Sequence, residues 1–281
     1  MKFSERIGII KAKDTIQVDY IDDDLKNGLW NAVQVFYLDQ VDSKYIDQSS
    51  YRDFFYVLWH NFFKLPLDEI DNWYGTTRLQ IREWFFRWEW YEVYDFIEYI
   101  TKIESNTSAE KFIIFCNELL EQELSGYRFI NGIIAPITSE SEIQEIDEAI
   151  TNTTNDKLIG VKTHLENALK LIANRDSPDY RNSIKESISA VESISKVLSS
   201  GSKNSLGSAL DKLKGKIEIH PALERGFKQI YGYTSDSDGI RHALMEESKS
   251  DFEDAKYMLV ACSAFVNYLI VKADKSGLMN K

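Results

Sequence analysis

The chain has 281 residues, of which 43% are hydrophobic and 28% are charged. This composition fits one large or two small globular domains and excludes a disordered chain. The net charge of −12 is unevenly spread: residues 1–150 hold 14 Lys and Arg against 28 Asp and Glu, a balance of −14, and the remaining 19 and 17 leave residues 151–281 at +2. An acidic first half repels nucleic-acid phosphates, so contact with RNA is expected only in the second half.

The sequence indicates a cytoplasmic protein. No apolar core segment follows Met1, so no signal peptide is expected. No stretch reaches the roughly 20 apolar residues of a membrane span. The nearest approach, residues 257–271, contains Asn267 and is interpreted as a buried core helix. Cys116 and Cys262 are interpreted as reduced, buried thiols.

Helical spacing of apolar residues dominates the first half. A loose alternation over residues 15–21 predicts a short strand, and Asp22 with its two acidic neighbours is interpreted as a helix cap rather than a metal site. Apolar periodicity then predicts helices over 25–37, 51–64, 77–100 and 109–124. Asn131-Gly132 between apolar runs predicts a β-hairpin over 127–136. Ser139 and Glu142 form a capping-box pattern for a helix reaching about residue 150.

A polar stretch, residues 151–155, is the predicted domain boundary. Helices are predicted beyond it at 157–174, 179–199, 205–216, 221–231 and 252–273, with a short one from Gly239. The expected fold is therefore mainly α with two domains. Residues 1–150 form an aromatic-rich helical domain with a small β-hairpin, and residues 156–281 form a helical bundle.

All six tryptophans lie between Trp30 and Trp90. The aromatic run over residues 84–91 can in principle stack on bases, but its acidic surroundings favour a core or a partner-binding surface. His60 lies within an aromatic helix and is interpreted as a packed histidine. The sequence has no zinc-type Cys/His spacing and no Gly-rich phosphate loop, so neither a metal nor a cofactor is expected.

Three stretches of the second half, residues 179–192, 236–243 and 254–269, together resemble the HEPN-type C-terminal domain of bacterial abortive-infection proteins. Residues 2–6 and 25–31 resemble the N-terminal domain that accompanies it in AbiJ-type proteins. The resemblance implies a helical bundle that dimerises, and in active members a metal-independent endoribonuclease. The signature of active members is an arginine followed, after four to six residues, by a histidine.

This chain departs from that signature, because Arg241 directly precedes His242 and no histidine has an arginine at the usual spacing. The adjacent pair is either a variant that supplies the same two groups or a mark of lost activity. The resemblance also implies an assisting polar residue from an earlier helix. Asn182 and Glu192 are the candidates, and a solvated helix face is the competing interpretation for both.

The residues themselves fit the chemistry. Metal-free RNA cleavage needs a base, a cation for the phosphorane and an acid, and histidine and arginine supply such groups. Asp238 can cap a helix that carries Arg241 and His242 in its first turn. Neighbours in a helix point about 100° apart, so one chain does not easily direct both groups to one phosphate, whereas a two-fold dimer can bring one group from each chain together. A purely structural Arg-His pair remains the alternative.

The sequence therefore supports three hypotheses. The first is an anti-phage defence protein acting as a dimeric HEPN endoribonuclease, with RNA such as tRNA as substrate and a protein partner on its N-terminal domain. The second is a non-catalytic HEPN adaptor or RNA-binding subunit. The third is a helical scaffold without a nucleic-acid role. None of the three involves a membrane.

Overall fold

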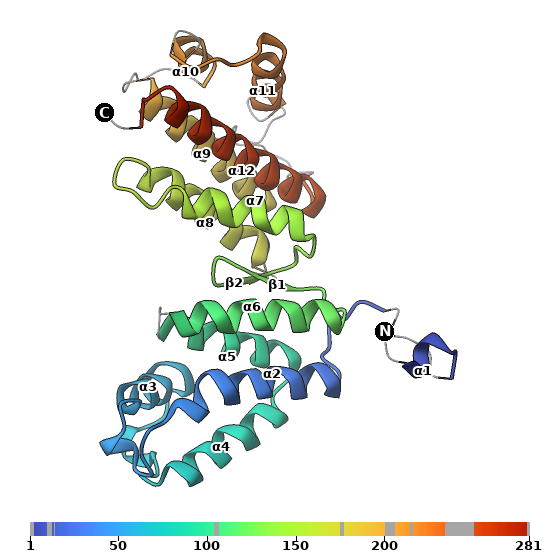
Figure 1. Ribbon diagram of the computed structural model, residues 1–281, viewed down its shortest axis with the longest axis vertical. Helices are drawn as coiled ribbons and strands as arrows, with labels where there is room; N and C mark the ends of the chain where they lie inside the picture. Colours follow the sequence, from blue (N-terminus) through green and yellow to red (C-terminus); the bar gives the residue numbers. More distant parts are fainter. Residues whose placement is uncertain are drawn as a thin grey trace. The chain divides into compact units, whose positions relative to one another are not determined.

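The computed structural model describes residues 3–9, 13, 15–103, 107–174, 177–199, 206–213, 216–233 and 250–279. Across these ranges the protein is mainly helical, with a small two-stranded antiparallel hairpin (Figure 1). The predicted mainly-α class is confirmed. The chain divides into two compact units, unit 1 (Met1–Thr138) and unit 2 (Ser139–Lys281).

Unit 1 is built from helices and short turns of helix around an aromatic core. In chain order its α-helices and strands are α1 (Phe3–Arg6), α2 (Asp23–Phe36), α3 (Arg52–Val57), α4 (Tyr74–Arg87), α5 (Trp90–Ile103), α6 (Thr107–Gln122), β1 (Arg128–Ile130) and β2 (Ile133–Ala135). Three 3-10 turns, η1 (Leu38–Gln40), η2 (Ile46–Gln48) and η4 (Leu67–Glu69), and a π-helical turn, η3 (Leu58–Phe63), connect them.

The predicted cap of α2 is confirmed, since the Asp22 carboxylate accepts a hydrogen bond from the Leu25 N–H at 2.9 Å. One face of α2 is buried in the core and packs against α6. The aromatic run of residues 84–91 also contributes to this core. Phe85 is fully buried, and Trp84, Trp88 and Trp90 are partly buried and pack against the core cluster. Of the two predicted alternatives for this run, a core or a partner-binding surface, this packing supports the core.

The predicted helix over 77–100 is wrong in one respect, because the structure has two helices, α4 and α5. Trp88 adopts an extended conformation between them. Lys26 donates from Nζ to the carbonyls of Phe86 at 3.2 Å and Trp88 at 2.6 Å, which satisfies the end of α4. The Glu92 carboxylate accepts the Glu89 N–H at 2.8 Å. Apolar periodicity continues across the break, so the sequence pattern alone did not show it.

The interpretation of His60 as a packed residue is also wrong. His60 lies in the π-helical turn that continues α3, where its side chain is exposed and its Nδ1 lies 2.7 Å from Asn61 Oδ1. A π turn holds more residues per turn than an α-helix. Here it buries Trp59 fully and leaves His60 facing solvent.

The predicted hairpin is confirmed, with its turn at Asn131-Gly132. Both residues have positive φ, +46° and +72°, as such a two-residue turn requires. Asn117 of α6 fixes the hairpin to the unit, because its side chain donates to the Phe129 carbonyl at 2.9 Å and accepts the Phe129 N–H at 2.7 Å.

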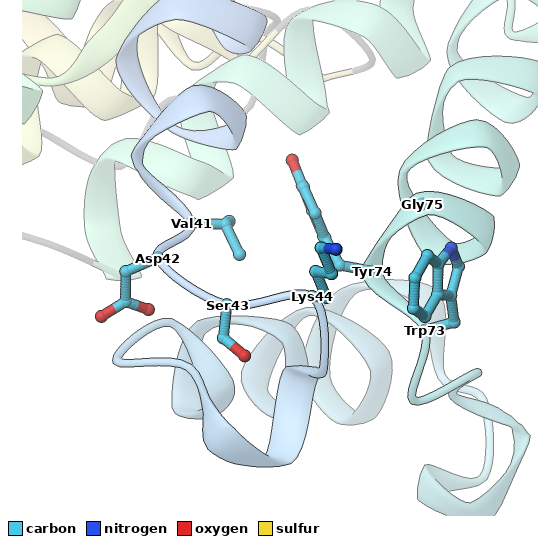
Figure 2. Close-up of a pocket in the computed structure, with 7 residues that line it drawn as sticks. All are labelled: Val41, Asp42, Ser43, Lys44, Trp73, Tyr74 and Gly75. Carbon is cyan, nitrogen blue, oxygen red and sulfur yellow. The ribbon is translucent and has the colours of Figure 1, made fainter.

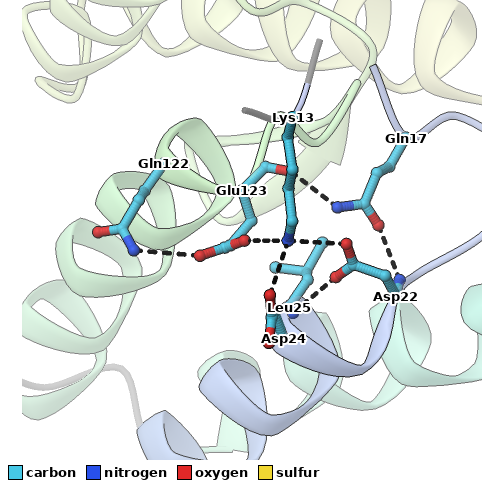
Figure 3. Close-up of polar contacts among 7 residues, drawn as sticks. All are labelled: Lys13, Gln17, Asp22, Asp24, Leu25, Gln122 and Glu123. Atoms are coloured by element: carbon cyan, nitrogen blue, oxygen red, sulfur yellow. Dashed lines mark hydrogen bonds and ion pairs between the residues drawn. The ribbon is translucent and has the colours of Figure 1, made fainter. Parts of the chain in front are cut away.

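The strand predicted over 15–21 reduces, among the described residues, to a single parallel bridge between Gln17 and Ser125. Figure 3 shows how this segment is held to α2 and α6. The buried Gln17 donates from Nε2 to the Glu123 carbonyl at 2.7 Å and accepts the Asp22 N–H at 2.8 Å. Lys13 contacts Asp22 at 2.8 Å, Asp24 at 3.2 Å and also Glu123.

Replacing Lys13 by alanine is expected to lower the free energy of unfolding by about 1 kcal/mol at neutral pH. Desolvation raises the pKa of Asp22, but hydrogen bonds from Lys13 and the Leu25 N–H outweigh it and hold the pKa below its ordinary value of 3.8. A lowered carboxyl pKa stabilises the fold above the ordinary pKa, and this stability is lost as the pH falls through the lowered value.

The effect of Lys13→Ala should therefore be present at neutral pH and vanish in acid well below the ordinary carboxyl pKa. Urea unfolding at both pH values measures it. Lys111→Ala, at an exposed site on α6, is the control and should change little at either pH. An undiminished effect of Lys13→Ala in acid would contradict the carboxylate contacts as its cause.

Unit 2 consists of α7 (Glu140–Thr151), α8 (Ile159–Ala173), α9 (Tyr180–Leu198), α10 (Leu206–Leu213), α11 (Pro221–Tyr233) and α12 (Phe252–Lys275). Helix α9 packs against both α8 and α12, and α12 also packs against α7. Apolar spacing in the sequence predicts one buried face for Tyr180, Ile184, Ile188, Val191 and Ile194; the last four are buried, whereas Tyr180 is partly exposed. The predicted helix from Gly239 lies outside the described residues.

Helix α7 starts after Ser139 as predicted, but the capping box does not form. The Ser139 side chain makes no cap hydrogen bond, and Glu142 instead forms an ion pair with Lys256 of α12 at 3.1 Å. The buried Asn267 of α12 donates to the Glu145 carbonyl at 3.0 Å. These contacts place α7 in unit 2, so the two units divide at 138/139, whereas the polar stretch at 151–155 follows α7.

Helix α12 is long and apolar enough to cross a membrane by length and composition. Half of its most apolar window is buried inside the protein, and α12 packs on α7, α8 and α9. This burial is typical of the core helix of a soluble domain, as the sequence predicted for residues 257–271.

Candidate functional site

Arg241 and His242, the predicted catalytic pair, lie outside the residues that the structure describes. The two predicted assisting residues are both on α9. Asn182 lies in its first turn and is exposed, whereas Glu192 lies near its C-terminal end and is half-buried.

Asn182 braces the start of α9. Its backbone N–H donates to Asp179 Oδ1 at 2.9 Å, and its side-chain Nδ2 donates to Asp179 Oδ2 at 2.6 Å. Asp179 is the N-cap of the helix. These contacts give Asn182 a structural role at the start of α9.

Glu192 lies one turn before Lys196, with its Oε2 at 3.7 Å from the Lys196 ammonium. Ten residues separate Asn182 from Glu192, which is about 15 Å along the helix axis. The same spacing rotates the two side chains about 80° apart around the axis. The structure therefore does not bring these two predicted residues together.

A third polar pair was missed by the sequence interpretation. His164 of α8 and Glu186 of α9 meet at 2.7 Å between Nδ1 and Oε2, and both side chains are partly exposed. The register of the two helices is fixed by a hydrogen bond from Ser183 Oγ to the Ala168 carbonyl at 2.8 Å. A carboxylate that orients an imidazole in this way leaves the second ring nitrogen able to exchange a proton. Only the register between the packed helices α8 and α9 reveals it.

The thiols are as the sequence predicted. Cys116 and Cys262 are buried and free of disulfides. Burial raises the pKa of the Cys116 thiol well above its ordinary value and that of Cys262 to about 12. Neither is a thiolate nucleophile at neutral pH. In the described part of the chain, no three His, Cys, Asp or Glu side chains gather as metal ligands would.

Unit 1 carries an open pocket of about 410 Å³ between two loops (Figure 2). Residues 41–44 form one wall, and Trp73, Tyr74 and Gly75 at the start of α4 form the other. The walls are joined by hydrogen bonds from Ile46 N to the Asn72 carbonyl and from Tyr74 N to the Lys44 carbonyl, both at 2.9 Å. Nothing in the sequence pattern predicted this pocket, because its two walls are separated by about 30 residues in the sequence.

The comparison with protein families decides the classification. The family profile described as AbiJ N-terminal domain 4 matches residues 1–152, which is more than half of the chain. The chain belongs to this AbiJ family. Membership assigns the protein to abortive infection, an anti-phage defence, and confirms the AbiJ-type resemblance of the first half. No curated protein and no solved structure matches the chain significantly.

The AbiJ match and the packing divide the chain differently. The match includes all of unit 1 and also α7, which packs with α12 in unit 2. The pocket therefore lies inside the AbiJ domain. Asn182, Glu192 and the His164–Glu186 pair lie beyond the matched residues, on α8 and α9 of unit 2.

Proposed function

We propose that this AbiJ-family protein is a cytoplasmic, metal-independent endoribonuclease whose second half is a HEPN-type effector. The main support for the proposal is the position, in unit 2, of the stretches that resemble HEPN domains. Two of its three stretches, residues 179–192 and 254–269, lie on α9 and α12, which pack against each other in the core of unit 2. The third stretch contains Arg241 and His242, outside the described residues.

In the proposed reaction a histidine removes the proton of an RNA 2′-hydroxyl, and the 2′-oxygen attacks the adjacent phosphorus. The bond from phosphorus to the 5′-oxygen breaks, leaving a 2′,3′-cyclic phosphate, and a protonated group returns a proton to the leaving oxygen. His242 is the proposed base or acid. Arg241 is the proposed cation that stabilises the charge on the phosphorane.

Adjacent residues of one helix diverge, so we propose that Arg241 and His242 act in a homodimer formed by the second halves of two chains. Light scattering of the purified protein tests the dimer. Cleavage of total RNA in excess EDTA tests the activity, and products with cyclic phosphate ends are expected. Cleavage that requires added Mg²⁺ would exclude the proposed chemistry.

The second candidate is a non-catalytic HEPN adaptor that binds RNA. The adjacency of Arg241 and His242 favours it, because active members of the HEPN group separate these residues. A thermal shift on addition of tRNA, without cleavage by the confirmed dimer, is the result expected for this candidate. In both cases we propose that the AbiJ domain recruits a protein partner or senses infection.

A further inference from the structure

The pocket of unit 1 exposes an aromatic surface that the core does not use. Trp73 is 46% exposed, whereas Trp30 and Trp59 are buried and the remaining three tryptophans pack against the core. Tyr45, also 42% exposed, contacts Trp73 edge-on with the ring centroids 5.6 Å apart. The indole thus forms an apolar platform at the surface.

The platform is held in a fixed position. The Asp71 carboxylate accepts the backbone N–H of Trp73 at 2.8 Å. The backbone hydrogen bonds between the two walls lie on either side of the Tyr45–Trp73 pair. Burial raises the pKa of Tyr74 to about 12, and its hydroxyl donates to the Leu38 carbonyl at 2.6 Å. Gly75 lets the indole lie close, since a Cβ there would be 2.7 Å from Trp73 Nε1.

The pocket lining contains one carboxylate, Asp42, and one ammonium, Lys44, within an acidic unit. Asp42 Oδ1 accepts from Ser49 Oγ at 2.8 Å and from the Ser50 N–H at 3.0 Å, and these bonds lower the Asp42 pKa, so the carboxylate stays ionised. Unit 1 as a whole contains 14 Lys and Arg against 23 Asp and Glu in residues 1–138, a balance of −9. This field attracts basic segments.

We propose that this pocket receives a basic side chain from a short segment of a partner protein. The aliphatic stem of the arginine or lysine lies against Val41 and the Trp73 indole, and its charged group is stabilised by the indole face and the Asp42 carboxylate. Lys44, the one cation among the lining residues, opposes this ligand. The proposal concerns the AbiJ domain alone and does not depend on ribonuclease activity.

The indole N–H signals of the full-length protein provide the test, because six tryptophans give six signals and Trp73→Phe assigns one of them. The probe is a blocked five-residue peptide of alternating arginine and leucine, compared with the same peptide carrying glutamate and with adenosine monophosphate. We expect the arginine peptide to shift the Trp73 signal selectively, with an affinity that falls as salt is added.

Variants of the lining residues give the sharper result. Trp73→Ala and Asp42→Asn should each weaken binding of the arginine peptide about 3–10-fold. Lys44→Glu should strengthen it by a similar factor of about 3–10 at low salt. Asp68→Asn, an exposed carboxylate outside the pocket, is the matched control and should leave the affinity nearly unchanged.

The proposal is overturned if the glutamate peptide or the nucleotide shifts the Trp73 signal in place of the arginine peptide, or if Lys44→Glu abolishes binding. Either result would identify an anion site. It is also overturned if no probe moves the Trp73 signal at millimolar concentration while Trp73→Phe retains the folded spectrum.

Discussion

Replacing Phe96 by alanine is expected to lower the free energy of unfolding of unit 1 by about 3–5 kcal/mol. Phe96 is 1% exposed, and its ring packs against four other aromatic rings. Its ring centroid lies 5.1 Å from Trp88, 5.5 Å from Phe62, 6.1 Å from Phe85 and 6.4 Å from Phe63. Alanine loses the buried ring area and leaves a cavity that rigid aromatic neighbours cannot fill.

Tryptophan fluorescence during urea unfolding measures this loss for unit 1 specifically, because every tryptophan of the chain lies within it. Tyr91→Ala is the matched control. Tyr91 belongs to the same helix but is 51% exposed, so its truncation should change stability by less than about 0.5 kcal/mol. A loss below about 1 kcal/mol for Phe96→Ala would contradict the packing around Phe96.

Replacing His242 by alanine is expected to reduce RNA cleavage by about 10²–10⁴-fold, because general acid–base catalysis contributes that much to a proton-transfer step. The dimer and the thermal stability should be retained, which separates a chemical role from a structural one. Arg241→Lys should reduce cleavage less than Arg241→Ala, since lysine keeps the charge and loses the planar fork of donors.

The other histidines of unit 2 are controls for this experiment. His220 is exposed and accepts the Ala222 N–H at 3.2 Å through Nδ1, so His220→Ala should leave cleavage unchanged. His164 is paired with Glu186 between α8 and α9. A loss of cleavage in His164→Ala, with full activity in His242→Ala, would move the proposed site to that pair.

Local signals in the sequence predicted local structure well. The Asn131-Gly132 turn formed because it requires two positive φ angles, and Asn-Gly is one of the few residue pairs that accept both. The predicted cap at Asp22 formed because its carboxylate lies three residues before a free helical N–H, which it can accept. The buried faces of α2 and α9 followed from apolar spacing alone.

The errors arose where residues distant in sequence compete for the same groups. Glu142 pairs with Lys256 instead of closing a capping box with Ser139. The carbonyls at Phe86 and Trp88 are satisfied by Lys26 from α2, which ends α4 within a continuous apolar pattern.

The candidate site shows the same limit. Residue chemistry and the family resemblance together suggested Arg241 and His242, and the resemblance led to Asn182 and Glu192, which the fold separates along α9. The sequence pattern did not indicate the His164–Glu186 pair or the pocket at Trp73, because each depends on the register between two elements.

The decisive measurement is cleavage of total RNA and tRNA in EDTA by the wild-type dimer and by His242→Ala side by side. We expect the wild type to cut RNA without metal and the variant, still dimeric and folded, not to cut it. Absence of cleavage by the wild-type dimer, or equal cleavage by the variant, would contradict the proposal that His242 makes this AbiJ-family protein a ribonuclease.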